Sequence, residues 1–508
     1  MIKNFLMLSL LLNCFLATAQ KKDRTAFIAD SLQTYIETGM KDWNIPGLSV
    51  AIVKDDHIVF MKGFGVTDHT SKQPVDEHTV FMIGSNTKAF TATALSILQD
   101  AKVLTLNDKV QQWLPEFTLN NALAAQEATI VDMLSHRIGF ETFQGDFTYW
   151  MSNLTRAEII QKMSLIEALY GFREKWGYCN AGYVVAGEII PRATGKSWSK
   201  MLQDSILTPL KMTRTQTLTH AIGAIKNTAK PHSFINYKLT ETPFVNIDNL
   251  APAGSMSSSA NDMAKWLKVQ LNNGKLDGEQ VLNTNSLQII RTPSAILNVD
   301  VRDKQETHFY LYALGLSVND RDGKLVYSHT GGINGFLSSV MFIPEEQLGI
   351  VVLTNTDENY FFQNLTHEIR DAFLGLPYQD YSKRSLTEYK KGKATERTEM
   401  EALKRVASQH NKTPFPLKEY AGTYVNSVYG NVEIKAEDAK LTMYFSNHPH
   451  MTATLDYLQD NTYLCTFSEP IFGIIKIPFK VEENAVEGFT LKVANHIERT
   501  PYKFVKQE

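Results

Sequence analysis

Residues 81–98 constrain this chain most, because they join an apolar run, a glycine and a serine to the start of a helical pattern. The serine is Ser85, and it lies at the predicted first turn of the helix. Lys88 follows three positions later, so the hydroxyl and the ammonium group share one helix face. The apolar residues that form the buried stripe of the helix are Ala89, Ala92, Leu95, Ile97 and Leu98.

The pair Ser85 and Lys88 is suited to nucleophilic catalysis. A serine hydroxyl is a poor nucleophile until a neighbouring base removes its proton. A helix N-terminus also offers free N–H groups and a partial positive charge to a developing oxyanion. The spacing alone is weak evidence, since the same pattern recurs at Ser197 and Lys200 and also describes a capping serine followed by a solvated lysine.

Length and composition predict a folded chain with more than one domain. At 508 residues the chain exceeds the size of one ordinary hydrophobic core. A hydrophobic fraction of 43% with 10% aromatic residues is enough to build such cores. The net charge of −3 is close to neutral and no long basic run occurs, which disfavours nucleic acid and anionic membrane surfaces as partners.

The first residues predict an export signal. Lys3 precedes an almost entirely apolar run over residues 5–16, and Ala17-Thr18-Ala19 is a small-residue cleavage site. Residues 1–19 are therefore expected to be a signal peptide, which is too short to span a bilayer. Lipoprotein processing at Cys14 is the alternative, but the residues before it match that signal poorly. The mature protein is expected to be periplasmic or secreted, without a transmembrane segment.

Cysteines and clustered histidines predict neither a disulfide framework nor a metal site. Only Cys179 and Cys465 follow the predicted cleavage site. Two buried free thiols are favoured, although an oxidising compartment would allow one long-range bridge. His448-Pro449-His450 is expected to be an exposed loop rather than a zinc site.

Residues 20–377 predict a mixed body in which strands at both ends flank a helix-rich middle, so that one sheet joins distant segments of an α/β or α+β fold. The predicted helices are 30–43, a short helix within 104–115, 129–136, 181–193, 199–207, 261–272 and 360–374. The predicted strands are 48–53, 58–64, 310–318, 324–329, 337–343 and 348–354.

The last quarter of the chain differs in its residue pattern from the part before it. Residues 378–414 are polar and are expected to form a linker that contains a charged helix. Residues 415–508 contain short strand patterns separated by Gly, Asn, Asp and Glu, which predict a small antiparallel β-sandwich or barrel.

Two further stretches contain residues that could take part in catalysis or substrate binding. Tyr178-Cys179-Asn180 places a phenol and an amide two positions apart before a predicted helix, although a packed tyrosine and a capping asparagine would give the same pattern. His329-Thr330-Gly331-Gly332 is predicted to end a strand with an imidazole and two glycines, whose backbone can approach a ligand closely. A plain strand-to-turn junction is the alternative reading.

Together the three motifs resemble those of the serine β-lactamase and penicillin-binding-protein superfamily, in the branch of class C β-lactamases, D-specific peptidases and related esterases. In chain order they are Ser85-x-x-Lys88, Tyr178-x-Asn180 and His329-Thr330-Gly331. The likeness extends to residues 45–53, 133–136 and 252–258 and covers roughly residues 25–375. It implies an antiparallel sheet flanked by helices plus an all-helical region, and the C-terminal strands are similar to the all-β module often appended to such enzymes.

The resemblance also implies roles for the motif residues. Ser85 would attack a carbonyl and form an acyl-enzyme, while Lys88 and Tyr178 would share the work of general base. Tyr178 would then protonate the leaving group. Asn180 would orient Lys88 and hold a substrate amide, and the N–H groups of Ser85 and Gly332 would form the oxyanion hole. No metal or cofactor is needed.

Substrate contacts are implied for the third motif, His329, Thr330, Gly331 and Gly332. Many family members carry lysine where this chain has His329, and that lysine meets the substrate carboxylate. A histidine with a pKa near ~6.5 is mostly neutral at pH 7 and holds an anion less firmly. Activity should then fall near neutral pH for carboxylate substrates but not for neutral esters. Arg137-Ile138 is a second departure from the family pattern.

The expected function is that of an exported serine hydrolase with a small-molecule or peptide substrate: an ester, a D-residue peptide or amide, or a β-lactam. The alternative is a sensor similar to a penicillin receptor, which is acylated without turnover. The last domain is expected to be a glycan- or lipid-contacting module, a lid over Ser85 or a packing domain. The oligomeric state is not predicted.

Overall fold

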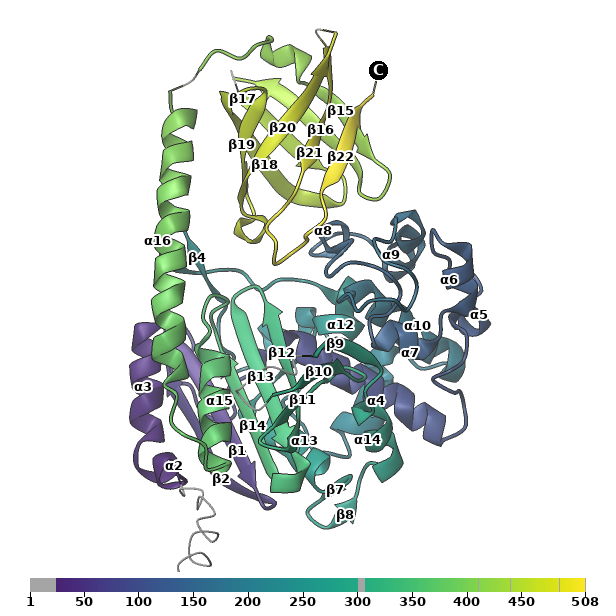
Figure 1. Cartoon of the computed structure of the whole chain (residues 1–508), viewed down its shortest axis with the longest axis vertical. Coiled ribbons are helices and arrows are strands. Elements are labelled where there is room, and N and C mark those ends of the chain that lie inside the picture. Colours follow the sequence, from purple (N-terminus) through teal and green to yellow (C-terminus); the bar gives the residue numbers. More distant parts are fainter. Residues whose placement is uncertain (1–23, 300–306, 410, 439, 484, 508) are drawn as a thin grey trace, which may run out of the picture.

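The computed structural model describes residues 24–299, 307–409, 411–438, 440–483 and 485–507. Figure 1 shows a mixed α/β body, a β-barrel above it and one long helix, α16, that runs alongside both. The predicted signal peptide, residues 1–19, lies outside the described residues.

An antiparallel eight-stranded sheet forms the centre of the body, in the order β2-β1-β14-β13-β12-β11-β10-β9. Its strands are β1 (Gly47–Lys54), β2 (His57–Gly65), β9 (Ala295–Val299), β10 (Phe309–Tyr312), β11 (Ser317–Arg321), β12 (Lys324–Ile333), β13 (Phe336–Ile343) and β14 (Leu348–Thr354). The first hairpin of the chain pairs with β14, where Val50 faces Val352. The sheet thus joins the two ends of the body, as the sequence predicted.

Helices cover both faces of this sheet, which explains why β1 and β14 are buried along almost their whole length. One face packs on α2 (Ala26–Asp30), α3 (Leu32–Asp42) and α15 (Phe361–Phe373) through Leu48, Val50 and Ile52. The other face packs through Ala51 and Val53 in the core that contains α4 (Thr87–Asp100) and α13 (Ala260–Leu271). The alternation follows the two-residue period of a strand.

A helical region lies beside the sheet, on the right of Figure 1. Its helices are α5 (Val110–Trp113), α6 (Ala122–Glu127), α7 (Ile130–Leu134), α8 (Asp146–Tyr149), α9 (Arg156–Lys162), α10 (Asn180–Thr194), α11 (Trp198–Leu202) and α12 (Ala251–Gly254). Helix α10 is buried over most of its length and contacts α7, α9 and α12. The antiparallel sheet and the helical region confirm the predicted fold class.

Residues 310–318 are not one strand, as the sequence suggested, but the hairpin of β10 and β11. Gly315 turns the chain at φ +75° against the start of helix α4. A Cβ atom added to Gly315 would lie 2.7 Å from the backbone nitrogen of Ala89, so this turn position has no room for a side chain. A second correction is that β12 does not end at His329 but continues to Ile333.

Arg137, the unexplained departure from the family pattern, neutralises a buried carboxylate. Its Nη2 atom lies 3.0 Å from Oδ1 of Asp132, which has no exposed surface, and Arg173 binds the same carboxylate at 2.6 Å. Burial opposes ionisation of Asp132, but hydrogen bonds from Arg173 and Thr129 outweigh it and lower its pKa. Arg137 therefore has a structural role beside helix α7.

The C-terminal strands close into an eight-stranded antiparallel barrel. They are β15 (Gly422–Asn426), β16 (Gly430–Glu437), β17 (Lys440–Phe445), β18 (His448–Gln459), β19 (Thr462–Phe467), β20 (Ile474–Glu482), β21 (Ala485–Leu491) and β22 (Tyr502–Lys506). Pairing of Tyr424 with Lys506 closes the ring, and aromatic rings such as Phe479 and Phe489 fill it. Of the predicted sandwich and barrel, the barrel is correct.

Helix α16 (Tyr381–Ala407) occupies most of the predicted linker. Leu386 packs on the body and Ala407 packs on Leu458 and Leu464 of the barrel, so the helix contacts both parts. The rest of α16 is charged and mostly exposed. Across the residues that the structure describes, no helix has both the length and the apolar character of a membrane span.

Cys179 and Cys465 are both buried and unpaired, which confirms the expectation of two free thiols. The prediction of an exposed loop at 448–450 is wrong for His448. This residue begins strand β18 and is buried, with hydrogen bonds to Tyr429 and to the backbone of Trp150. His450 is exposed as predicted.

Candidate active site

Ser85 occupies a short 3-10 turn, Gly84–Asn86, between strand β3 (Phe81–Met82) and helix α4. Gly84 has a φ of +51°, and a Cβ atom added to it would lie 2.9 Å from the backbone nitrogen of Gly332. The turn is therefore packed directly against the edge of strand β12. Ser85 itself is partly exposed and lines a cavity, so the predicted position at the start of the helix is correct.

Lys88 is completely buried next to Ser85. Its Nζ atom donates to Ser85 Oγ at 3.2 Å, to Asn180 Oδ1 at 2.8 Å and to the carbonyl oxygen of Ala253 at 2.8 Å. Burial lowers the pKa of Lys88 to about 7, against the opposing influence of Asp146 and Cys179. A large fraction of this amine is thus neutral near pH 7 and can accept the serine proton.

Tyr178 lies on the other side of the serine. Its phenol is hydrogen-bonded to Ser85, and its ring centroid is 4.6 Å from Lys88 Nζ. Burial raises the pKa of Tyr178 well above 10, so the phenol stays protonated at neutral pH. The phenol can therefore donate a proton to a group that lies beside Ser85.

Asn180 does not cap helix α10, since its side chain connects two other groups. Oδ1 accepts from Lys88, and Nδ2 donates to Asp146 Oδ2 at 2.6 Å. Because Nδ2 donates to Asp146, the amide oxygen of Asn180 is left facing the lysine. Burial raises the pKa of Asp146 to about 7.

Strand β12 supplies the wall opposite helix α4. Ser338 of β13 accepts from Asn86 at 2.8 Å and donates to the carbonyl of Ile83 at 2.8 Å, which ties the serine turn to the sheet. Gly332 is exposed toward the cavity. The predicted motif residues Ser85, Lys88, Tyr178, Asn180, His329, Thr330, Gly331 and Gly332 therefore lie in one region of the molecule.

His329 is held by a directed chain of hydrogen bonds. The backbone N–H of Cys179 donates to Nδ1 of His136 at 3.0 Å, so the proton of this neutral ring is on Nε2, 3.3 Å from the Tyr312 hydroxyl. Tyr312 donates to His329 Nε2 at 3.0 Å, because His329 Nδ1 must donate to the Thr330 carbonyl at 2.6 Å. The chain links the second motif to the third.

This environment corrects the expected pH behaviour of His329. Burial and the neighbouring Lys88 lower the pKa of His329 to about 3. The ring is therefore neutral throughout the range in which a protein of this kind is assayed. A loss of carboxylate binding through His329 near neutral pH, as the sequence suggested, is not expected.

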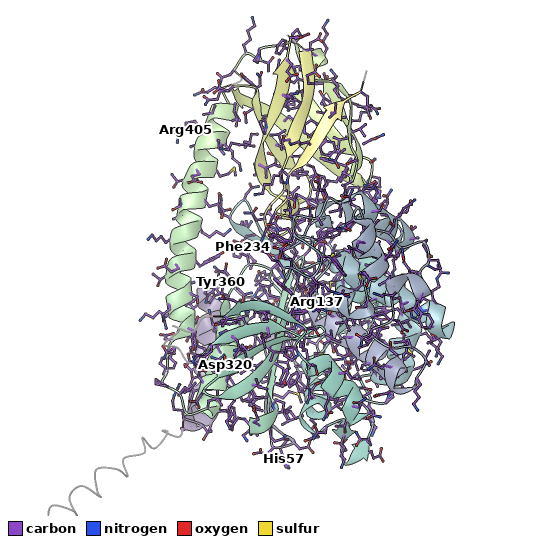
Figure 2. The ribbon with its side chains drawn as sticks, turned by 45° about the vertical axis from the view of Figure 1, so that its right-hand side comes forward. His57, Arg137, Phe234, Asp320, Tyr360 and Arg405 are labelled. Carbon is purple, nitrogen blue, oxygen red and sulfur yellow. The ribbon has the colours of Figure 1, made fainter. Side chains whose placement is uncertain are left out.

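The site opens into a cavity of about 1860 Å³ between the body and the barrel. Phe234, on the hairpin of β4 (His232–Ile235) and β5 (Lys238–Glu241), lies between the two parts in Figure 2. The barrel contributes the segment 466–475, and helix α16 contributes Lys393 and Met400. Substrate must therefore fit a space that several distant segments enclose.

Sequence reasoning missed four groups of this site: Asp146, His136, Tyr312 and the carbonyl of Ala253. His136 and Ala253 lie inside stretches that matched the family, which was the available signal. No sequence pattern marks Asp146 or Tyr312, because their importance comes from burial beside residues that are distant in the chain.

Gly331→Ala should separate the serine turn from β12. The added Cβ atom would lie 1.9 Å from the carbonyl oxygen of Ile83 and 2.5 Å from Ser338 Oγ, and both must move. We expect a destabilisation of about 1–3 kcal/mol and a fall in ester turnover of about 100-fold. Gly392→Ala is the control, since nothing lies within 4 Å of its Cβ position. Equal turnover of wild type and Gly331→Ala would contradict this placement.

Family models and known proteins match most of this chain. The model of the Beta-lactamase family matches residues 32–373, and that of Domain of unknown function (DUF3471) matches residues 407–506. Unguisins hydrolase ungD of Aspergillus violaceofuscus is 25% identical over 493 residues, which cover 89% of this chain and 85% of that protein. Two solved structures with lower identity share the fold.

The first is the octameric penicillin-binding protein homologue from Pyrococcus abyssi, with 22% identity, a TM-score of 0.62 and coverage of 94% of this chain and 100% of that one. The second is a D-stereospecific amidohydrolase from Streptomyces sp., with 21% identity, a TM-score of 0.56 and coverage of 68% and 98%.

Proposed function

The chain belongs to the Beta-lactamase family, and we propose that it is an exported serine hydrolase that forms an acyl-enzyme on Ser85. The observation that carries the proposal is the buried amine of Lys88, 3.2 Å from Ser85 Oγ and with a pKa lowered to about 7. A lysine in this state is a general base matched to neutral pH. The similar proteins that are named as hydrolases suggest that the reaction is a hydrolysis.

The geometry supports the following sequence of steps. Ser85 Oγ attacks a substrate carbonyl carbon while its proton passes to Lys88. The oxyanion faces the backbone N–H groups of Ser85 and Gly332. Tyr178 gives its proton to the leaving nitrogen or oxygen and regains one from Lys88, which breaks the scissile bond and leaves the acyl group on Ser85. Water, deprotonated by the same pair, releases the acid and restores the hydroxyl.

The cavity favours a peptide over a compact ligand. Its volume of about 1860 Å³ exceeds the roughly 300–1,000 Å³ of typical small-molecule pockets. His329, buried and neutral, provides no cation for a substrate carboxylate. We therefore place neutral peptide amides and esters, including those of D-residues, ahead of β-lactams. A relative named unguisins hydrolase and the D-stereospecific amidohydrolase with the same fold are consistent with this order.

Covalent trapping tests the function. The full chain would be treated with a fluorophosphonate, a chromogenic cephalosporin, D-peptide esters and short acyl esters, and each adduct would be located by intact mass and peptide mapping. We expect an adduct on Ser85 and turnover of at least one amide or ester. A stoichiometric burst without turnover would favour the sensor, and absence of any adduct on Ser85 would reject both.

Export is a separate proposal, based on the signal pattern of residues 1–19. Expression of the full gene in a bacterium should yield a periplasmic or secreted protein whose first residue is Gln20. A cytoplasmic product that retains Met1 would contradict it.

The pH dependence of kcat/KM should follow the neutral fraction of Lys88. Because the folded pKa lies about 7, activity on a neutral ester is expected to rise with pH below 7 and to level off above it. A substrate carrying a carboxylate should give a parallel curve, since His329 does not titrate there. An acid limb confined to one substrate would contradict this assignment. The titratable groups facing Lys88 are Tyr178, Tyr183, Cys179, His136, His329 and Asp146.

A further inference from the structure

Helix α8 belongs to the body by sequence but packs against the end of the barrel, beneath which it lies in Figure 1. Phe147 has no exposed surface and is part of the barrel's aromatic core. Its ring stacks on Tyr429 with centroids 4.8 Å apart and on His448 at 5.7 Å. A residue of the catalytic body thus completes the packing at one end of the barrel.

A buried carboxyl group of the barrel holds the first turn of α8; burial raises its pKa to about 8, against the hydrogen bonds that it accepts. Glu498, 1% exposed, accepts from the backbone nitrogen of Gly145 at 2.9 Å with one oxygen. Its other oxygen accepts from the backbone nitrogen of Phe147 at 3.0 Å and from the Tyr502 hydroxyl at 2.7 Å. Tyr502 in turn accepts from Thr148 at 3.2 Å. All the groups that hydrogen-bond to Glu498 are therefore donors. The other ionisable side chains near it are those of Asp146 and Tyr149.

The other end of α8 is held in the same way. Nε2 of His448 lies 2.9 Å from the Trp150 carbonyl, so this nitrogen carries the proton. Nδ1 then accepts from the Tyr429 hydroxyl at 2.6 Å. The barrel consequently fixes the backbone on both sides of a helix of only four residues, which would not keep its shape alone.

Asp146 lies between the two backbone nitrogens that Glu498 binds, and it is the residue that orients Asn180 toward Lys88. We propose that Glu498 and Tyr502 of the barrel are positioning residues for the reaction, because they fix Asp146 and thereby the amine of Lys88. The inference rests on the function proposed above. It gives the C-terminal domain a part in the chemistry, in addition to its part in enclosing the cavity.

The physical basis is the precision that proton transfer requires. A shift of about 1 Å in a catalytic group can cost on the order of 100-fold in rate. Movement of α8 would carry Asp146 away, release the amide of Asn180 and admit water around Lys88. Hydration of Lys88 would relieve the desolvation that lowers its pKa, whereas loss of the nearby Asp146 would remove an influence that raises it. Desolvation is the larger of the two, so the acid limb of the pH profile would move to higher pH.

Two substitutions in the full chain test this, with a matched control. Glu498→Gln replaces one acceptor oxygen by an N–H₂ group, which in either orientation of the amide faces a donor: the Gly145 nitrogen, or the Phe147 nitrogen and the Tyr502 hydroxyl. Tyr502→Phe removes a single hydroxyl that reaches Glu498. The control, Tyr424→Phe, removes an equally buried hydroxyl whose bond to the Tyr420 carbonyl, 2.8 Å long, stays inside the barrel.

On a p-nitrophenyl ester we expect kcat to fall about tenfold for Glu498→Gln and a few-fold for Tyr502→Phe, with KM nearly unchanged. The acid limbs of their pH profiles should move to higher pH. Tyr424→Phe should have the kcat of the wild type and an acid limb at the same pH. Thermal melting would verify folding of each variant.

Three results would overturn the inference. In the first, Glu498→Gln leaves kcat and the acid limb of the pH profile unchanged; in the second, Tyr424→Phe and Tyr502→Phe lower kcat equally; in the third, the variants change KM alone. These differ from failure of the proposed function, in which the wild type itself would form no adduct on Ser85. If Glu498→Gln fails to fold, Thr148→Val tests the same connection from the body side, through its bond to Tyr502. Wild-type kcat and limb in Thr148→Val would then count against the inference, and a shifted limb would support it.

Discussion

Ser85→Ala should lower kcat by about a million-fold and abolish every covalent adduct, as removal of the nucleophile does in subtilisin. The reason is that no neighbouring group can replace the hydroxyl. Lys88 is completely buried and donates to two other oxygens, and Tyr178 stays protonated at neutral pH. Intact mass after fluorophosphonate treatment and single-turnover kinetics would measure the loss.

The second Ser-x-x-Lys of the chain provides a matched control. Ser197 caps helix α11 by accepting from the backbone nitrogen of Lys200 at 3.2 Å, and the Lys200 ammonium pairs with Asp204 at the surface. Ser197→Ala should cost about 1 kcal/mol of stability and leave kcat unchanged. Labelling that survives in Ser85→Ala, or that is lost in Ser197→Ala, would show that the nucleophile has been assigned to the wrong serine.

These two serines show how much of the site could be predicted from the sequence. Spacing alone did not separate them, but the order of three motifs selected Ser85, and the fold brings those motifs together at the serine turn. The body and the class of the C-terminal domain were also predictable, because strand and helix periods are local properties. Closure of the barrel was not, since it depends on β22 pairing with β15, whose residues lie far apart in the chain.

The errors have a common physical origin. Residues 310–318 read as one strand because apolar residues continue through them, whereas in the fold the chain turns at Gly315, close against helix α4. His448 read as an exposed loop because the pattern around Pro449 is polar, whereas α8 covers it in the fold. The neutral state of His329 likewise comes from burial by residues of other segments. Tertiary packing decided each case, and no local pattern reports it.

Lys88→Met should lower kcat/KM by about 10³-fold, within the range that a general base contributes, and should remove the acid limb near pH 7. Methionine keeps an unbranched chain but cannot accept a proton. It also leaves the oxygens of Asn180 and Ala253 without their donor. Lys200→Met is the control, because that lysine belongs to the same type of motif but is exposed and pairs with Asp204. Persistence of the limb in Lys88→Met would identify another base.

Comparison with Tyr178→Phe separates the two proton-transfer roles. The low pKa of Lys88 and the high pKa of Tyr178 mean that, near neutral pH, the lysine is the group able to accept a proton and the phenol the group able to give one. Lys88→Met should therefore reduce ester and amide cleavage alike. Tyr178→Phe should keep the acid limb but reduce amide cleavage far more than p-nitrophenyl ester cleavage, because an amine needs a proton to leave and p-nitrophenolate does not. Equal losses on both substrates in Tyr178→Phe would mean that the phenol acts in the attack of Ser85 instead.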